Sequence, residues 1–249
     1  MQNPFRTICD GETTAQRFSD LCDAIRNHPD CADAIVFTGD ILDFFTESAF
    51  DFMCENLRKL PIPYIFTLGN HDMIFSKRRE EEVRDIFLEL CGGNTELQKN
   101  KLGELALIGI DNTRNYYTDE ALKDLDEALA GEQHAVLFQH IPLSTNGYHE
   151  FSMAAGPKDW SLGNEDICIG DSWKKVLGLI EAEDTKIRAL VCGDGHIEYE
   201  SSIGGITSLF LRWAQNIRLS GLPFMLRRRC PVCIFMMGMS ENVFTDHGS

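Results

Sequence analysis

Residues 65–72, IFTLGNHD, form the most informative stretch of the chain, because an apolar β-type run ends there in side chains that can bind a metal. The same arrangement occurs three more times, as IVFTGD at 35–40, VLFQH at 136–140 and LVCGDGH at 190–196. Each apolar run predicts a short buried strand. Ligands of α/β sheets bind beyond the strand ends, where the loops converge. The four runs together therefore predict an α/β sheet with a ligand site at its strand ends.

Helical periodicity alternates with the strands. Apolar residues at 18, 21, 22 and 25 have the i, i+3, i+4, i+7 spacing of an amphipathic helix, and similar spacing recurs over 50–57, 122–129 and 173–180. Thr118 is a candidate N-cap, and Thr13 with Gln16 forms a candidate capping box. The predicted strands lie at 7–9, 34–38, 64–68, 105–110, 135–139 and 189–192. This alternation is typical of an α/β protein.

Three segments depart from this alternation. Residues 144–172 form a long polar insertion, and loops of such length in a compact domain are usually functional or mobile. Residues 197–212 alternate weakly around Gly204-Gly205, which predicts a hairpin. The last segment is basic and apolar. We expect one domain over 1–208 and a tail over 209–249 that packs on the domain or is poorly ordered.

Composition limits the class of protein. The chain has 249 residues, 43% hydrophobic and 25% charged, which is ordinary for a globular protein. Acidic residues outnumber basic ones 39 to 23, for a net charge of -16. The tail, residues 209–249, has a net charge of about +3, and residues 1–208 have a net charge of about -19. Because phosphate-backbone binding needs clustered Lys and Arg, we expect no nucleic-acid surface.

The compartment is predicted from the cysteines and the first residues. Nine cysteines are scattered along the chain, an odd number, and Met1 to Pro4 lack the basic and apolar lead of a signal peptide. No apolar run approaches the roughly 18 residues of a membrane span. We therefore expect reduced thiols, no transmembrane segment and a cytoplasmic location. Cys230 and Cys233 have zinc or redox spacing, but no second pair completes a site, so incidental tail cysteines are the favoured interpretation.

The ordered motifs resemble those of the calcineurin-like metallophosphoesterases. That signature runs Asp-x-His, Gly-Asp, Gly-Asn-His-Asp or Gly-Asn-His-Glu, a single His after a strand, and Gly-His-x-His. Residues 39–40, residues 69–72 and His140 match it in order. The resemblance covers roughly residues 5–208 and implies an αββα sandwich, in which two mixed β-sheets stack face to face with helices outside.

Two motifs depart from the signature. Asp10-Gly11-Glu12 replaces Asp-x-His, and residues 193–196, GDGH, replace Gly-His-x-His. In both, a carboxylate stands where the family has an imidazole. Carboxylates still bind hard divalent ions, but Glu12 and Asp194 would cancel positive charge at the site. We therefore expect weaker attraction for phosphate and a preference for Mn or Mg.

The resemblance implies two adjacent divalent ions, Mn foremost, with Fe, Zn or Mg as alternatives. The implied ligands are Asp10, Glu12, Asp40, Asn70, His140, Asp194 and His196. Asp40 would bridge the ions, with Asp10, Glu12 and His196 on the first and the remaining three ligands on the second. Between them the ions would supply an attacking hydroxide and positive charge against the phosphoryl oxygens.

The resemblance also implies catalytic and substrate-binding residues. His71 would face the substrate and protonate the leaving oxygen, and Asp72 would orient His71. Asn70 and His71 would contact the substrate. Arg114, His149 and Trp160 are further candidates for substrate contact, because they lie in loops after strands or in the long insertion.

We therefore expect a metal-dependent hydrolase of a small phosphomonoester or phosphodiester, with a small phosphorylated molecule as its substrate. Taken alone, a Gly-Asp pair after a strand is usually a turn and a lone His such as His140 is usually structural; their order along the chain favours the family. One alternative is a protein of this fold with an impaired site that binds without turnover, which Glu12 and Asp194 favour. Another is an interaction scaffold that uses its basic tail.

Overall fold

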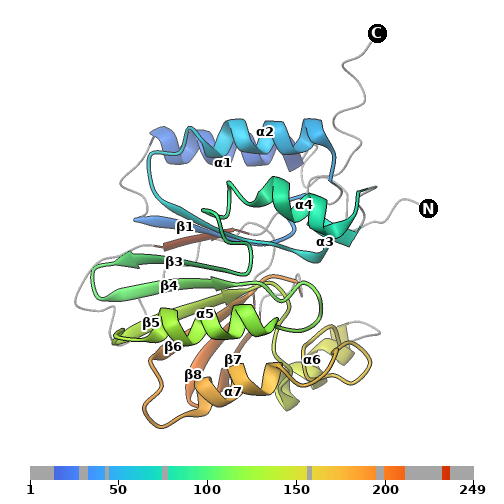
Figure 1. Ribbon diagram of the computed structural model, residues 1–249, viewed down its shortest axis with the longest axis vertical. Coiled ribbons are helices and arrows are strands. Elements are labelled where there is room, and N and C mark those ends of the chain that lie inside the picture. Colours follow the sequence, from blue (N-terminus) through green and yellow to red (C-terminus); the bar gives the residue numbers. More distant parts are fainter. Residues whose placement is uncertain are drawn as a thin grey trace.

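The computed structural model describes residues 14–27, 33–42, 45–74, 78–155, 159–194, 199–210 and 232–235. Figure 1 shows two β-sheets stacked between helices. One sheet has the strand order β2-β1-β9 and the other β3-β4-β5-β6-β8-β7. The predicted α/β sandwich is therefore confirmed.

The smaller sheet forms one half of the sandwich. Its strands are β1 (Ala34–Thr38), β2 (Tyr64–Thr67) and β9 (Val232–Phe235), and β1 pairs in parallel with both others. Its outer face packs on α1 (Thr14–Asn27), α2 (Glu47–Leu57) and α4 (Glu80–Phe87). Side chains alternate along a strand, so Ile35 and Phe37 face these helices, whereas Val36 faces the other sheet.

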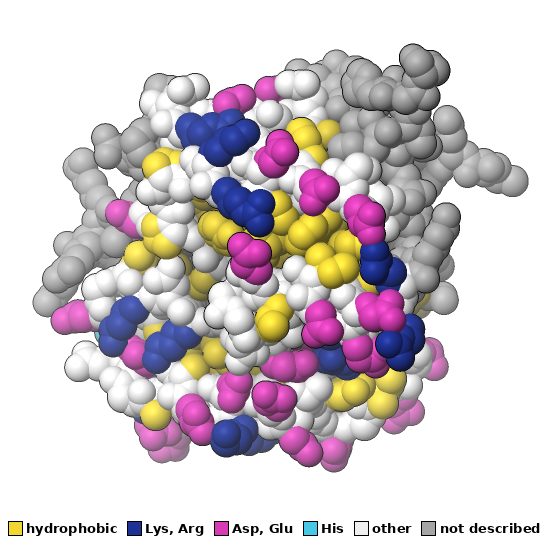
Figure 2. All heavy atoms as spheres, turned by 45° about the horizontal axis from the view of Figure 1, so that its top comes forward, with side chains coloured by type: hydrophobic (Ala, Val, Ile, Leu, Met, Phe, Trp, Pro, Cys, Tyr) yellow, Lys and Arg dark blue, Asp and Glu magenta, His cyan; other side chains and the backbone are white. Residues whose placement is uncertain are grey.

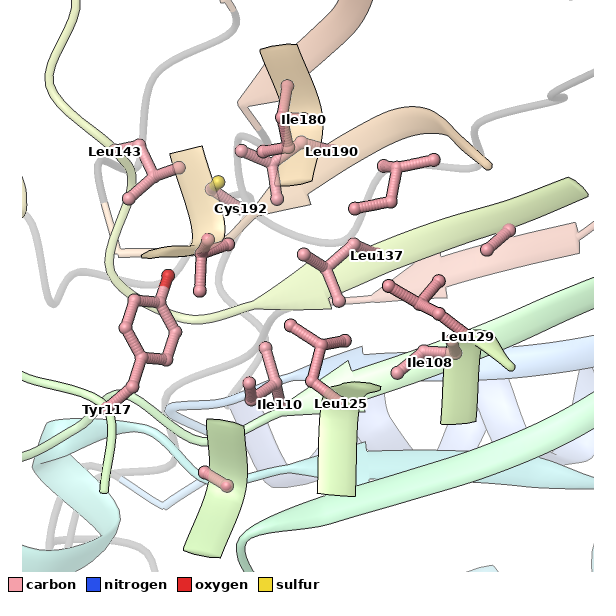
Figure 3. Close-up of a cluster of buried hydrophobic side chains, with 14 of the residues drawn as sticks. Ile108, Ile110, Tyr117, Leu125, Leu129, Leu137, Leu143, Ile180, Leu190 and Cys192 are labelled. Atoms are coloured by element: carbon pink, nitrogen blue, oxygen red, sulfur yellow. The ribbon is translucent and has the colours of Figure 1, made fainter. Parts of the chain in front are cut away.

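The larger sheet is mixed, as predicted. Its strands are β3 (Leu97–Leu102), β4 (Leu105–Ile110), β5 (His134–Gln139), β6 (Ile187–Cys192), β7 (Tyr199–Ile203) and β8 (Ile206–Phe210). The pairs β3–β4 and β7–β8 are antiparallel, and β4, β5, β6 and β8 run parallel. Helices α5 (Asp119–Leu129) and α7 (Trp173–Glu181) cover its outer face. Figure 3 shows this outer core: Leu125 and Leu129 of α5 lie beside Ile108, Ile110 and Leu137 of the strands, and Ile180 of α7 lies beside Leu190.

The two sheets meet over a separate apolar layer. Its buried members are Ala34, Val36, Ile65, Leu105, Leu107, Val136, Phe138, Ala189 and Val191. They come from β1, β2, β4, β5 and β6, so the central strands are buried on both faces. This explains why these strands are continuous apolar runs.

Most predicted elements are present. The runs at 34–38, 64–68, 105–110, 135–139 and 189–192 correspond to strands, and the four periodic segments correspond to α1, α2, α5 and α7. Thr118 caps α5, since its side chain accepts from the N–H of Ala121. The predicted hairpin is β7–β8, and Gly204 and Gly205 both have positive φ there. The capping box at Thr13 and the strand at 7–9 lie outside the described residues.

Other elements were not predicted. They are β3, α3 (Asn70–Ile74), α4, α6 (Asn146–Ala155) and β9. Helix α6 lies inside the polar insertion 144–172. Strand β9 lies within residues 209–249, where it pairs with β1. The division of the chain at 208 remains a prediction.

Charge on the surface is mixed. On the face in Figure 2, Lys and Arg side chains are interspersed among Asp and Glu. Among the residues described, no helix combines the length and apolar character needed to cross a membrane.

Candidate metal centre

The turn after β1 presents Asp40. Gly39 has φ +88°, a conformation that favours glycine, and Asp40 has φ 54°. A Cβ on Gly39 would lie 2.6 Å from both the Cα of Gly69 and Nδ1 of His140. A Cβ on Gly69 would lie 2.0 Å from the backbone N of Asp40. The two glycines therefore allow the β1 and β2 turns to touch, which brings Asp40 beside Asn70.

Asp72 ties these two turns together. It is fully buried, and its carboxylate accepts backbone N–H groups from Leu42 at 2.8 Å, Gly69 at 2.8 Å and Asp40 at 3.1 Å. Burial and the neighbouring charge of Asp40 raise the pKa of Asp72 to about 7, although the N–H donors oppose this shift. These contacts make Asp72 a positioning group for Asp40. Its predicted role in orienting His71 remains a prediction.

His140 connects the ends of β1, β5 and β6. Its Nδ1 lies 2.8 Å from the carbonyl oxygen of Thr38. Its own carbonyl oxygen accepts the N–H groups of Gly193 at 2.9 Å and Asp194 at 3.0 Å. The side chain of His140 is completely buried. Hydrogen bonds of the backbone therefore fix both the imidazole and the turn that carries Asp194.

Three oxygen atoms surround Nε2 of His140. Oδ1 of Asn70 lies at 2.8 Å, Oδ1 of Asp40 at 3.3 Å and Oδ1 of Asp194 at 3.4 Å. Because a carbonyl oxygen can only accept, Nδ1 carries the proton, so Nε2 of the neutral ring presents a lone pair to these oxygens. Such a set of lone pairs requires a cation, either a proton on Nε2 or a metal ion. The ligand atoms of Asp40, His140 and Asp194 all lie within 4.8 Å of one another.

The electrostatics of the centre agree with this requirement. Burial disfavours a charged imidazole, but Asp40 and Asp194 outweigh that effect and raise the pKa of His140 well above its ordinary value. Imidazole, carboxylate and amide oxygen form a donor set that suits divalent ions such as Mn, Fe or Zn. A Nδ1 contact with a backbone carbonyl is also the usual outer contact of a metal-binding histidine. The residues present therefore fit a metal ion.

His71 lies directly beside this centre. It follows Asn70 in α3, and its backbone N–H donates to Oδ1 of Asp40 at 2.9 Å. Its side chain is half-buried. Thus four of the predicted ligands and the predicted acid come together at the strand ends. Asp10, Glu12 and His196 lie outside the described residues.

The other predicted substrate contacts are not among the groups that surround Nε2 of His140. Arg114 contacts three carboxylates: Nε lies 2.9 Å from Glu80, and Nη1 lies 2.9 Å from Glu96 and 3.3 Å from Asp111. These ion pairs account for Arg114 structurally, and its contact with substrate remains a prediction. His149 and Trp160 lie in the insertion, where the side chain of Trp160 is half exposed.

Sequence reasoning missed several groups that build the site. The carbonyl of Thr38 and the amide N–H groups around Asp72 are backbone groups, which no residue pattern reveals. Asp159, whose Oδ2 lies 2.7 Å from Nδ1 of His149, was also missed. It follows no strand motif, so only the fold of the insertion identifies it.

Comparison with known proteins now assigns the family. A family model described as calcineurin-like phosphoesterase matches residues 12–198, which is most of the chain. The chain therefore belongs to the calcineurin-like phosphoesterase family, whose members are metal-dependent phosphoesterases in general. A comparison with curated proteins finds no relative of the chain.

Solved structures include similar chains. One is GAP50, the anchor in the inner membrane complex of Plasmodium, with 13% identity over 84% of this chain and 70% of that chain, at a TM-score of 0.48. Another is the phosphopantetheinyl hydrolase PptH from Mycobacterium tuberculosis, with 12% identity over 81% of this chain and 83% of that chain, at a TM-score of 0.46. The family assignment rests on the sequence match.

Proposed function

We propose that this chain holds two divalent cations at the strand ends and hydrolyses a small phosphomonoester or phosphodiester. One observation supports this proposal most: three oxygen atoms lie 2.8 to 3.4 Å from Nε2 of His140. A buried arrangement of this kind needs positive charge, and the family uses divalent ions in general.

The geometry supports four of the proposed ligands, which are the ones that the structure describes. Asp40 lies in the turn after β1, against the turn after β2, and would serve as the ligand shared by both ions. Asn70, His140 and Asp194 would hold one ion. The other ion uses Asp10, His196 and Glu12, which are assigned through the family pattern alone. When bound, such ions supply positive charge against the phosphoryl oxygens and lower the pKa of a water molecule.

The remaining steps belong to side chains of this chain. His71 donates a proton to the leaving oxygen, because it lies next to the ligands without being one of them. Asn70 and His71 contact the phosphoryl group. Asp72 acts through Asp40, since it holds the two turns at the distance that the centre requires. The buried contacts between Thr38 and His140 keep that imidazole in one tautomer.

Asp194 adjusts the charge of the centre. It supplies a carboxylate where the family pattern has an imidazole, and only 17% of its side chain is exposed. An added negative charge about 5 Å from a phosphate costs on the order of 3 kcal/mol at an effective dielectric near 20. The proposed enzyme therefore favours hard ions, Mn or Mg, and binds phosphate less tightly than a site with an imidazole there.

The function is tested by assays on metal-depleted protein. Mn is added back, and hydrolysis of p-nitrophenyl phosphate and of bis-p-nitrophenyl phosphate is measured. We expect Mn-dependent release of p-nitrophenol from at least one ester, and the same activity in Asp171→Asn, which changes an exposed carboxylate outside the centre. Metal binding without turnover of either ester would instead support a binding protein with an impaired site, which Asp194 favours.

A further inference from the structure

A polar pocket lies in the insertion, outside the metal centre. It measures about 350 Å³ and is lined by Ser144, His149, Asp159 and residues 163–166. Hydrogen bonds fix its wall: the N–H of Ser144 donates to the carbonyl of Leu162 at 2.7 Å, and the N–H of Leu162 donates to the carbonyl of Pro142 at 2.8 Å. The pocket is thus built on a paired stretch of backbone.

An oriented imidazole forms part of the lining. Nδ1 of His149 lies 2.7 Å from Oδ2 of Asp159, whose side chain is 1% exposed, whereas that of His149 is 56% exposed. The hydroxyl of Ser161 donates to the other oxygen of Asp159, and Nδ2 of Asn164 donates to the carbonyl of Asp159 at 2.6 Å. Since a carboxylate can only accept, Nδ1 carries the proton. In the neutral form of the ring, Nε2 is then the acceptor that a ligand can reach.

The chain keeps the pocket within a limited distance of the proposed metal centre. Ser144 follows His140 by four residues, which limits their separation to at most about 14 Å. Tyr148 is buried, which raises the pKa of its phenol, and the charges of Asp194 and Asp159 raise it further. Tyr148 is therefore influenced by carboxylates of both sites. Figure 1 shows α3 and α6 at the same end of the sheets.

The chemistry of the lining selects a ligand class. The lining residues that the structure describes include three carboxylates, one imidazole and no Lys or Arg. Glu165 and Asp166 are exposed at the rim. Together with Nε2 of His149, they offer acceptors and negative charge, so a ligand needs hydrogen-bond donors and no anionic group. At about 30 Å³ for each water molecule, the volume of about 350 Å³ corresponds to about twelve waters, which is enough for a sugar ring.

We infer that this pocket binds the leaving group of the phosphoester, and that this group is a sugar or polyol without negative charge. The inference rests on the proposed function, because it places the phosphate at the metal centre and the hydroxyl groups in the pocket. His149 accepts a hydrogen bond from one hydroxyl, and Glu165 and Asp166 exclude an anionic leaving group.

Three esters of similar size test the charge preference. They are glucose 6-phosphate, glucosamine 6-phosphate, which adds an ammonium group, and 6-phosphogluconate, which adds a carboxylate. We expect kcat/KM for 6-phosphogluconate to be lower than that for glucose 6-phosphate. Each pocket carboxylate near the added charge should lower it about fivefold, because two like charges 4 Å apart repel by about 1 kcal/mol in water. The gap should shrink as salt is raised. If kcat/KM is higher for glucosamine 6-phosphate than for glucose 6-phosphate, the leaving group is an amino sugar. If the two values are equal, it is a neutral polyol. Equal rates for the anionic and neutral esters would overturn the inference.

Variants test whether the residues of this pocket cause the charge preference. In the double variant Glu165→Gln, Asp166→Asn, the ratio of kcat/KM for glucosamine 6-phosphate to that for 6-phosphogluconate should fall at least fivefold. In His149→Phe, KM for glucose 6-phosphate should rise while kcat changes less. Asp171→Asn, in the same insertion but outside the pocket, should keep the wild-type ratio. An unchanged ratio in the double variant would overturn the assignment of this pocket.

A binding measurement separates this inference from the proposed function. The same esters are titrated calorimetrically into the Mn-loaded protein and its double variant. If no ester is hydrolysed but the dissociation constants follow the expected order, the proposed activity fails and the pocket assignment stands. If esters are hydrolysed but neither kcat/KM nor the dissociation constants depend on Glu165 and Asp166, the pocket assignment fails and the activity stands.

Discussion

His71 and Asp40 are adjacent residues in space with different expected roles. The backbone of His71 contacts Asp40, yet its side chain is assigned to the leaving group and not to a metal ion. His71→Ala should therefore lower kcat by about 10²–10⁴ while the metal content stays near wild type. Steady-state kinetics and elemental analysis of the same preparation check this. Loss of the metal from His71→Ala would show that the residue is a ligand.

Asp194 is the residue whose charge departs from the family pattern. Asp194→His removes a negative charge from the proposed phosphate site, so inorganic phosphate should inhibit the variant at least tenfold more strongly, because the expected charge effect of about 3 kcal/mol corresponds to roughly 100-fold. The inhibition constant and the bound metal are measured together. Unchanged values of both would rule out a role for Asp194 in setting the charge of the centre.

At the level of single residues, the sequence predicts part of the site. Asp40, Asn70, His140 and Asp194 were expected together because each follows an apolar strand, and the structure brings them together. The contacts that hold them could not be predicted in the same way. The carbonyl of Thr38 is a backbone group that any residue would supply, and it depends on the register of the sheets.

The turns after β1 and β2 determine how closely the elements approach. In Gly69→Ala the new Cβ would overlap the backbone N of Asp40, at 2.0 Å. We expect a loss of stability of at least about 1–3 kcal/mol and at least tenfold weaker metal binding, because the turns must separate. Urea unfolding and metal titration measure the two effects.

Gly178→Ala is the matched control. Gly178 lies in α7 and nothing is within 4 Å of an added Cβ, so this change should stabilise the helix by roughly 0.5–1 kcal/mol. Wild-type metal affinity in Gly69→Ala would contradict the close approach of the two turns.

The elements themselves were predictable where the apolar pattern was long. Strands β4, β5 and β6 are buried on both faces and appear as apolar runs. Strand β3 lies at the edge of its sheet, and most of its side chains are at least partly exposed. Its sequence, LQKNKL, is therefore largely polar and has no apolar run. Helix α4 begins with three consecutive glutamates, which obscured the apolar spacing of Val83 and Phe87.

For the whole molecule, a buried ion pair links the two halves of the sandwich. Arg84 of α4, on the smaller sheet, pairs with Asp111, which follows β4 of the larger sheet, at 2.7 Å. Their side chains are 6% and 2% exposed. Arg84→Met should cost about 3 kcal/mol in the free energy of unfolding, because Asp111 loses a buried partner.

Lys123→Met is the control for this pair. Lys123 and Glu127 form an exposed ion pair within α5 at 3.5 Å, so the change should alter stability by less than about 0.5 kcal/mol. Both variants are compared by urea unfolding of metal-free protein. Equal stabilities would show that the buried pair does not hold the halves together.

Side chains from both halves of the sandwich are proposed to hold the divalent metal together. The most direct measurement is the metal content of the protein after Mn loading and dialysis, for wild type and Asp40→Ala. We expect two bound ions in wild type and their loss in Asp40→Ala, since the carboxylate of Asp40 would serve both ions. Wild-type protein that retains no divalent metal, or Asp40→Ala protein that retains as much as wild type, would contradict this proposal.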